Sequence, residues 1–316
     1  MEIVALAGGV GASKLLLGLH RVMDPRELTV IVNTGDDIVL HGLSISPDLD
    51  IVTYTLADLV NSDTGWGFRD ETFRALEQLA AYGGPDWFHL GDRDLATHIH
   101  RTAMLRAGVR LSEVADSIRR TLGVQARILP MSDDPVPTMI ETNQGRLHFQ
   151  EYLVRRRAEP TVQAISFHGI EHARPAPGVL EALARARTIV ICPSNPLISI
   201  GPILAVPGVR AALEKRRSHV VAVCPIVGGK SLKGPSDQML AQLGHPVSAL
   251  GVARMYQDIC GTMVIDPVDA TQRPEIEALD IEVVVHPTIM RELQDKELVA
   301  RTIVQFAANQ RAGSAA

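Results

Sequence analysis

Residues 2–22 read Glu2-Ile-Val-Ala-Leu-Ala-Gly-Gly-Val-Gly-Ala-Ser-Lys-Leu-Leu-Leu-Gly-Leu-His-Arg-Val22, and this stretch decides the fold. An apolar run of strand length ends in a glycine-rich turn, and leucines then recur at helical spacing. The β-branched run Leu28–Asn33 follows and is stopped by Thr34-Gly-Asp-Asp37. The start of the chain therefore predicts a strand, a glycine loop, a helix and a second strand, which is the βαβ unit of parallel sheets.

The same alternation returns in the second half of the chain. Helical patterns near Pro177, over Val209–Lys215 and near Glu292–Ala308 separate short apolar runs with the composition of buried strands. This alternation predicts a Rossmann-like α/β fold with a doubly wound, mostly parallel sheet. The strands expected in this half are Val162–Phe167, Thr188–Cys192, His219–Val223 and Ile281–Val285.

The segment at about 69–150 interrupts the alternation. From about Arg69 to Leu122 the pattern is that of several amphipathic helices, and Gln125–His148 has the pattern of short strands with a turn at Asn143-Gln-Gly145. No internal repeat and no linker between autonomous units is visible in the sequence. We expect residues 1–316 to form a single α/β domain, with a helical and short-strand insertion at about 69–150 that covers the sheet edge.

Composition restricts the class of function. The chain has 316 residues, 46% hydrophobic and 4% aromatic, and can bury a large aliphatic core. The net charge of −5 argues against a nucleic-acid backbone as partner, and Arg155–Arg157 and Lys215–Arg217 are interpreted as solvated helix faces. No apolar run approaches the ~18 residues of a membrane span, and no signal-peptide pattern opens the chain, so we expect a cytoplasmic protein.

The cysteines and histidines argue against a metal site built from those residue types. Cys192, Cys224 and Cys260 are scattered without a Cys-x-x-Cys pair, which indicates core residues rather than a disulfide framework or a zinc site. His98 and His100 lie two positions apart on a predicted helix and so face different directions. Any metal is therefore expected to be held by carboxylates.

The glycine loop and two acidic loops follow the first two predicted strands, where doubly wound folds bind their ligands. Small residues at Gly9 and Gly11 allow backbone amides to approach a phosphate at a helix N-terminus, with Ser13 and Lys14 available to assist. The glycine spacing matches neither the dinucleotide fingerprint nor the P-loop, so a purely structural turn is the alternative.

Four carboxylates are concentrated near the same sheet edge. Asp36 and Asp37 end the second strand, and Asp48 and Asp50 follow after a short loop. A group of carboxylates favours a hard cation such as Mg²⁺. The alternative is that Asp37 and Asp48 cap turns and Asp50 caps a helix.

Three further polar blocks fall at predicted strand ends: Leu90–His98, Ile128–Pro135 and Pro193–Pro202. Each has an ordinary structural alternative. An acid of the first block caps a helix, the acids of the second form a turn, and Ser194-Asn195 between two prolines is a rigid bend. The acids concerned are Asp92, Asp94, Asp133 and Asp134.

At these blocks the sequence resembles the phospholactate transferase family of deazaflavin coenzyme F-420 biosynthesis, called CofD in archaea and FbiA in mycobacteria. The resemblance runs from the N-terminus to about Asp258 and is weaker afterwards. The matching blocks are Ala7–Lys14, Val32–Asp37, Ser46–Asp50, Trp66-Gly67, Leu90–His98, Ile128–Pro135, His148–Gln150, Pro193–Pro202 and Gly251–Ala253.

The resemblance implies the activity. It implies transfer of a phospho-three-carbon-acid group (from 2-phospholactate, phosphoenolpyruvate or phosphoglycerate) from a GDP adduct to the terminal ribityl hydroxyl of the deazaflavin Fo. GMP leaves, and the product is F-420-0 or its dehydro form. Mg²⁺ is the implied cofactor, because phosphoryl transfer relies on positioning and charge neutralisation. The resemblance also implies a homodimer, and one sequence leaves the acid open.

The resemblance also assigns roles to residues. Asp36 and Asp48 are implied as catalytic metal ligands, and Asp50 and His89 as contacts to Fo. His89 departs from the lysine of an archaeal relative, which puts its contact in doubt. The residues implied for the nucleotide and its phosphates are Gly9, Gly11, Ser194 and Asn195. Ser13 and Lys14 of the glycine loop are the further candidates for binding phosphate.

Two other functions use similar sequence features. A nicotinamide-dependent oxidoreductase has the same kind of sheet, but the glycine spacing here is wrong for it. A nucleotide-sugar-binding regulatory protein of the gluconeogenesis-factor group shares the glycine loop and the Pro-Ser-Asn segment. The blocks Gly91–His98 and Met131–Pro135 favour the transferase over this second alternative.

Overall fold

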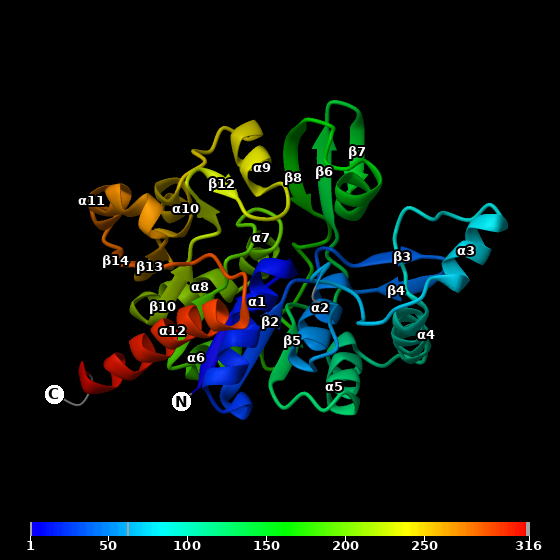
Figure 1. Ribbon diagram of the computed structural model, residues 1–316, viewed down its shortest axis with the longest axis horizontal. Coiled ribbons are helices and arrows are strands. Elements are labelled where there is room, and N and C mark those ends of the chain that lie inside the picture. The colour runs from blue at the N-terminus through cyan, green and yellow to red at the C-terminus, as the bar shows by residue number, and fades with distance from the viewer. Residues whose placement is uncertain (1, 62, 314–316) are drawn as a thin grey trace.

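A seven-stranded parallel sheet forms the centre of the computed structural model, which describes residues 2–61 and 63–313 (Figure 1). The strand order is β14-β13-β10-β9-β1-β2-β5, and every pair of neighbours is parallel. The strands are β1 (Ile3–Ala7), β2 (Leu28–Val32), β5 (Arg127–Pro130), β9 (Thr188–Ile191), β10 (Val220–Val223), β13 (Thr262–Ile265) and β14 (Glu282–Val285).

Both faces of the sheet are covered, which explains why its strands are almost uniformly apolar. In β1, Ile3 and Ala5 face one hydrophobic cluster, and Val4 and Leu6 face the other. One face carries α1 (Gly9–Val22), α2 (Pro47–Leu56), α5 (Leu111–Thr121) and α12 (Leu293–Gly313), with α1 packed beside α12 (Figure 1). The other carries α6 (Val179–Arg185), α7 (Ile200–Ala205), α8 (Val209–Glu214), α10 (Ala249–Tyr256) and α11 (Arg273–Glu277).

This arrangement confirms the predicted α/β fold with a doubly wound parallel sheet. From β1 the chain builds outward through β2 and β5 on one side, and from β9 it builds outward through β10, β13 and β14 on the other. The direction of building therefore reverses between β1 and β9. Ligands of such sheets bind beyond the carboxyl ends of the strands at this switch point.

Smaller elements surround that edge of the sheet (Figure 1). The hairpin of β3 and β4 extends with α3 and α4 to one side, and a three-stranded antiparallel sheet, in the order β7-β6-β8, lies above. The elements are β3 (Ile38–Leu40), β4 (Leu43–Ile45), α3 (Arg74–Ala81), α4 (Asp92–Arg106), β6 (Thr138–Thr142), β7 (Gly145–His148), a π-helix (Glu151–Arg155), β8 (Val162–Phe167), β11 (Ile226–Val227), β12 (Lys230–Ser231) and α9 (Ser236–Gln242). Short 3₁₀ turns occupy Pro25–Glu27, Arg217–His219 and Pro267–Gln272.

Two strand predictions were wrong in their placement. Val162–Phe167 belongs to the small antiparallel sheet, where its partly exposed side chains suit a strand that is not enclosed on both faces. Arg127–Pro130 was expected among the short strands of the insertion, but it pairs with β2 at the edge of the main sheet. The sequence analysis also missed β13. The division into one domain with an insertion at about 69–150 stays a prediction.

No helix within residues 2–61 and 63–313 is both long enough and apolar enough to traverse a bilayer.

Candidate functional site at the sheet switch point

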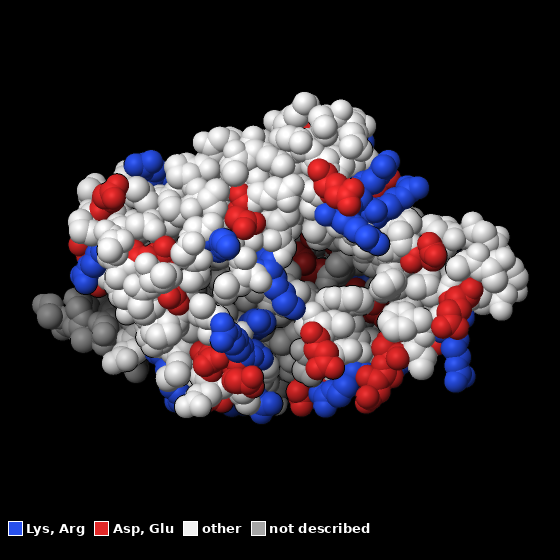
Figure 2. All heavy atoms as spheres, turned by 45° about the horizontal axis from the view of Figure 1, so that its top comes forward, with Lys and Arg blue, Asp and Glu red and all other residues white. Residues whose placement is uncertain are grey.

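A cavity of about 760 Å³ lies at the carboxyl ends of β1, β2 and β9, where the fold reverses direction. Its volume is in the range of small-molecule sites. Figure 2 shows the hollow, with acidic side chains in its depth and basic side chains on its rim. The cavity therefore combines an inner acidic surface with an outer basic one.

Nearly all of the residues predicted for the site line this cavity. The exception is Ser13, which is buried on α1 with its hydroxyl donating to the Val10 carbonyl at 2.9 Å. Its side chain is used inside the helix and is not among those lining the cavity. The predicted residues that do line it are Gly9, Gly11, Lys14, Asp36, Asp48, Asp50, His89, Ser194 and Asn195.

Asp36 and Asp48 form a buried carboxylate pair in the depth of the cavity. They are 6% and 4% exposed. The Asn33 side-chain amide lies between them and donates to Asp36 Oδ1 and Asp48 Oδ2, each at 2.9 Å. The Gly9 amide donates to the other oxygen of Asp48 at 2.8 Å, and the Gln150 amide donates to Asp36 at 3.5 Å. The pair predicted from sequence is thus assembled by the ends of β2, α2 and the glycine loop.

Burial makes this pair costly to ionise. It raises the pKa of Asp48 to about 6, although the bonds from Asn33 and Gly9 oppose the shift. Burial also raises the pKa of Asp36 well above its ordinary value, and the negative charge of Asp48 adds to that effect. Asn33 and Gly9 offer only neutral N–H groups, so the pair carries more negative charge than its donors compensate. Two carboxylates in this state form a donor set that fits a hard divalent cation.

The glycine loop packs tightly between the acid pair and the loop after β9. A Cβ on Gly8 would lie 2.7 Å from Asp48 Oδ2, and a Cβ on Gly11 would lie 2.3 Å from the Pro193 carbonyl oxygen. Gly9 has a φ of +71°, and its amide is bonded to Asp48. The sequence predicted that the backbone at Gly11 closely approaches a phosphate. In the structure it closely approaches the neighbouring loop.

Lys14, Ser194 and Asn195 surround the same loop. The Lys14 ammonium donates to the Met290 carbonyl at 2.9 Å, and burial, followed by the charge of Lys233, lowers its pKa. The Ser194 hydroxyl donates to the Gly8 carbonyl at 2.8 Å, and Asn195 Oδ1 accepts the Leu197 amide at 2.9 Å. The two side chains after β9 therefore hold the loops together, and their contact with a nucleotide stays a prediction.

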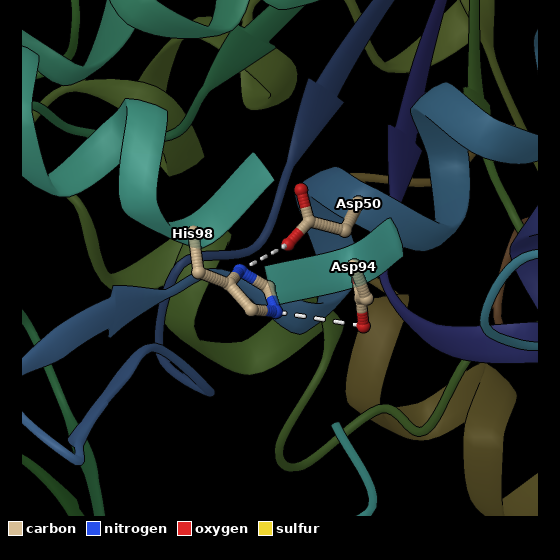
Figure 3. Close-up of side chains that lie close together, drawn as sticks. All are labelled: Asp50, Asp94 and His98. Carbon is tan, nitrogen blue, oxygen red and sulfur yellow. Dashed lines mark ion pairs between the residues drawn. The ribbon is translucent and has the colours of Figure 1, made fainter. Parts of the chain in front are cut away.

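Asp50 belongs to a buried network that the sequence analysis did not foresee. Arg101 donates to both of its carboxylate oxygens, one bond from Nη1 measuring 3.0 Å. His98 lies between Asp50 and Asp94, with Nδ1 3.7 Å from Asp50 and Nε2 3.4 Å from Asp94 (Figure 3). The prediction that only carboxylates hold a metal overlooked His98. Asp94 lies one helical turn before His98, so the two side chains are neighbours on the same face of the helix.

Ligand atoms of Asp50, Asp94 and His98 lie within 4.8 Å of one another, so this group could hold a metal ion. Arg101 opposes that use, because its guanidinium already compensates the charge of Asp50. Within the described residues, the donors to the acid pair are the neutral N–H groups of Gly9, Asn33 and Gln150. The Asp36 and Asp48 pair is therefore the better candidate for a cation.

Four aromatic side chains of the cavity lining are here called the aromatic wall. They are both tryptophans of the chain, Trp66 and Trp87, together with Phe88 and Tyr54. The predicted residue His89 is exposed there, with its ring centroid 6.4 Å from that of Trp66. A chain with only 4% aromatic residues places several of them in the lining of this cavity, and that scarcity is the sequence signal that was missed.

Two of the basic residues predicted as a solvated helix face are also part of the cavity lining. Arg155 and Arg157, interpreted from sequence as part of a solvated helix face, are exposed but line the cavity from the π-helix and the turn after it. Arg155 also pairs with Glu151 at 2.9 Å. These guanidinium groups place positive charge at the cavity entrance.

The other acids of the polar blocks are structural. Asp92 accepts the amides of Arg74 and Ala75 at the start of α3. Asp133 accepts both the amide and the hydroxyl of Ser112 at the start of α5. Asp134 accepts the Arg174 amide. The capping and turn interpretation therefore describes Asp92, Asp133 and Asp134, and Asp94 alone of these four acids lines the cavity.

Comparison with known proteins agrees with the predicted resemblance. The family described as "2-phospho-L-lactate transferase CofD" matches residues 3–301. A phosphoenolpyruvate transferase of Streptomyces griseus is 47% identical over 318 residues, 99% of this chain and 100% of that protein. A 2-phospho-L-lactate transferase of Methanosarcina mazei is 39% identical and covers 96% of this chain and 99% of its own.

A solved structure of a UPF0052 family member from Bacillus halodurans matches with a TM-score of 0.65, covering 96% of this chain and 98% of that one. Its sequence identity is 17%, so this likeness supports the fold alone. The family match and the relatives bear on function as well, and they confirm that the chain is an enzyme of the transferase class. With the match extending over nearly its whole length, the chain belongs to the CofD family of 2-phospho-L-lactate transferases.

Proposed function

We propose that the enzyme transfers a phospho-three-carbon-acid group from its GDP adduct to the terminal ribityl hydroxyl of Fo, releasing GMP and forming F-420-0 or dehydro-F-420-0. The acid is 2-phospholactate, phosphoenolpyruvate or phosphoglycerate. One observation carries the proposal: a single cavity is lined by the buried carboxylate pair, the glycine loop and the aromatic wall. The names of the relatives, a phosphoenolpyruvate transferase and a 2-phospho-L-lactate transferase, support it.

The aromatic wall suits a flat tricyclic acceptor. Trp66 and Trp87 offer faces on which a deazaflavin ring stacks, and His89 lies beside Trp66. Asp50 lines the same cavity but is held by Arg101. We therefore propose that Fo binds against the aromatic wall, with Asp50 serving as a fixed acceptor of hydrogen bonds rather than a mobile one.

The glycine loop suits the nucleotide substrate. The start of α1 directs the positive end of a helix dipole toward the cavity, and Lys14 adds an ammonium group from the next turn. Ser194 and Asn195 line the same region. Arg155 and Arg157 on the rim attract a polyanionic substrate before it enters.

Asp36 and Asp48 would hold Mg²⁺ between the two substrates. When bound, the ion neutralises negative charge on the phosphoryl oxygens during transfer. The residues themselves must bring the ribityl hydroxyl within about 3–3.5 Å of the phosphorus that bears the acid. We propose that the aromatic wall and the glycine loop achieve this by holding the two substrates in one cavity.

Product analysis tests the proposal. The purified enzyme is incubated with Fo, MgCl₂ and each of the three GDP adducts, and products are identified by mass. We expect GMP and one phosphodiester of Fo, with one adduct preferred over the others. Absence of a Fo phosphodiester with all three adducts, together with binding of a UDP-sugar, would refute the transferase assignment in favour of a nucleotide-sugar-binding protein.

The resemblance also supports a homodimer, which we propose as the solution state. Sedimentation equilibrium checks it, and a monomer at micromolar concentration would contradict it.

A further inference from the structure

The transfer needs a group that takes the proton of the attacking hydroxyl, and Asp94 is placed to do so. Its side chain lines the cavity near the aromatic wall and is 15% exposed, against 7% for Asp50. The Tyr54 hydroxyl donates to Asp94 Oδ1 at 2.8 Å. Each carboxylate oxygen has two lone pairs, so Asp94 retains acceptor capacity toward the cavity.

The tautomer of His98 follows from its neighbours. Arg101 Nη1 lies 3.2 Å from His98 Nδ1, and because a guanidinium only donates, Nδ1 must accept. The ring proton then sits on Nε2, which faces Asp94 Oδ2 at 3.4 Å (Figure 3). His98 is 1% exposed, and its Nε2 makes no hydrogen bond to any residue in the described part of the chain. His98 Nε2 thus lies close to the Asp94 carboxylate without a hydrogen bond to it, and the ring lies between Asp94 and Asp50.

The backbone of Asp94 is held just as firmly. Glu71 accepts the amides of Arg93 and Asp94, at 2.9 and 3.2 Å, at the start of α4. Asp92 reciprocates by capping α3, accepting the Ala75 amide at 2.9 Å. The two helix starts therefore cap each other, and this arrangement fixes the position from which the Asp94 side chain enters the cavity.

The other acids of the cavity are less suited to accept this proton. Asp36 and Asp48 face Asn33 and are the candidates for the cation. Asp50 is bonded to Arg101 through both oxygens. Asp86 lines the cavity but is exposed. Asp94 alone among them combines a carboxylate that accepts from the Tyr54 hydroxyl with a partly exposed place in the cavity lining.

We propose that Asp94 is the general base of the transfer, an inference that rests on the proposed function. The ribityl oxygen forms a bond to the phosphorus that bears the acid, and the bond from that phosphorus to the oxygen bridging to GMP breaks. The electron pair leaves with GMP, and the hydroxyl proton passes to Asp94. An aspartate plays this part toward the acceptor hydroxyl in protein kinases, which are also phosphoryl-transfer enzymes. Tyr54 and His98 act as positioning residues.

The test compares Asp94→Asn with the wild-type enzyme. The amide keeps the size of the side chain but cannot take the proton. We expect kcat to fall about 10²–10⁴-fold, with the dissociation constant for Fo changed less than about threefold and the thermal midpoint close to wild type. Asp133→Asn is the matched control, because that carboxylate also lies at a helix start and is outside the cavity lining. Its kcat should equal that of the wild type.

Tyr54→Phe provides a second test that does not remove the carboxylate. It deletes only the hydroxyl that orients Asp94, and we expect kcat to fall about tenfold with unchanged Fo affinity. Wild-type kcat in either Asp94→Asn or Tyr54→Phe would overturn the assignment, as would a loss in Asp94→Asn confined to Fo binding. If the wild-type enzyme itself forms no product from Fo and any adduct, the proposed function fails first, and the two failures are thereby distinguished.

Discussion

At alkaline pH, the buried Asp36 and Asp48 pair should make the enzyme less stable than a variant that lacks one of its carboxylates. In Asp48→Asn the ionisable group is replaced by a neutral one of the same size. The buried charge is removed, and so is the repulsion that contributes to the raised pKa of Asp36. The substitution loses one hydrogen bond, because the new amide has a single oxygen and cannot accept from both Gly9 and Asn33.

The magnitude follows from the pKa. Raising the Asp48 carboxyl from 3.8 to about 6 corresponds to about 3 kcal/mol at 1.36 kcal/mol per unit. Since the folded-state pKa lies above the unfolded one, this contribution to stability is fully present below about pH 3.8 and is lost as pH rises through about 6. The lost hydrogen bond costs about 1 kcal/mol at every pH. Asp48→Asn should thus be about 1 kcal/mol less stable than wild type near pH 4 and about 2 kcal/mol more stable near pH 8.

Urea denaturation of both proteins from pH 4 to 8 in a chelating buffer measures this difference. The same series in saturating MgCl₂ should stabilise the wild type by about 3 kcal/mol at a hundredfold excess over its dissociation constant, and Asp48→Asn much less. Turnover of the variant should fall by orders of magnitude. A stability difference that stays flat across this pH range without metal, or equal stabilisation of both proteins by Mg²⁺, would refute the reasoning.

Three further outcomes follow from the packing of the cavity. Gly11→Ala places a methyl group against the Pro193 carbonyl, so it should lower the free energy of unfolding by about 1–3 kcal/mol and weaken binding of the GDP adduct. In Gly9→Ala the new methyl group meets no atom within 4 Å, so this variant should lose only about 1 kcal/mol, through the strain of its positive φ. Urea denaturation measures the two stabilities, and calorimetry measures binding of the adduct. Trp87→Ala should raise KM for Fo at least fivefold and leave KM for the adduct unchanged, because one stacking face is worth about 1–3 kcal/mol; steady-state kinetics with each substrate varied in turn checks this. Ser13→Ala should keep wild-type kinetic constants, because the Ser13 hydroxyl donates to the Val10 carbonyl. A raised KM for the adduct would instead indicate that Ser13 contacts a phosphate of the substrate.

The fold was predictable because buried parallel strands are continuous apolar runs. β1, β2 and β9 each read in this way, and their order along the chain fixes where the sheet reverses. β8 was misplaced because its run Val162–Phe167 has strand character, while the neighbours that decide its sheet are distant in sequence. Pairing of β5 with β2 likewise depends on a contact across nearly one hundred residues, which periodicity cannot reveal.

The site was predictable where it depends on strand ends and was missed where it depends on tertiary packing. Asp36 and Asp48 follow directly from the position of β2 and the start of α2. The pairing of Asp50 with Arg101 joins α2 to α4, and no local pattern announces it. Ser13 shows the converse: its neighbours in the glycine loop line the cavity, but the helix turns its hydroxyl back onto Val10.

Two acids buried to the same depth a few residues apart are compensated in different ways, and the difference separates their roles. Asp50 is 5% exposed and receives a full positive charge from Arg101, so it is neutralised before any ligand arrives. Asp48 is 4% exposed and receives only neutral N–H groups, so its charge is compensated only when a cation binds. A buried carboxylate left in this state destabilises the free enzyme, as the pH dependence of Asp48→Asn should show. Such a cost is expected where the missing charge arrives with the ligand, and it supports our proposal that the cation binds at Asp36 and Asp48 while Asp50 belongs to the fixed frame that orients Fo.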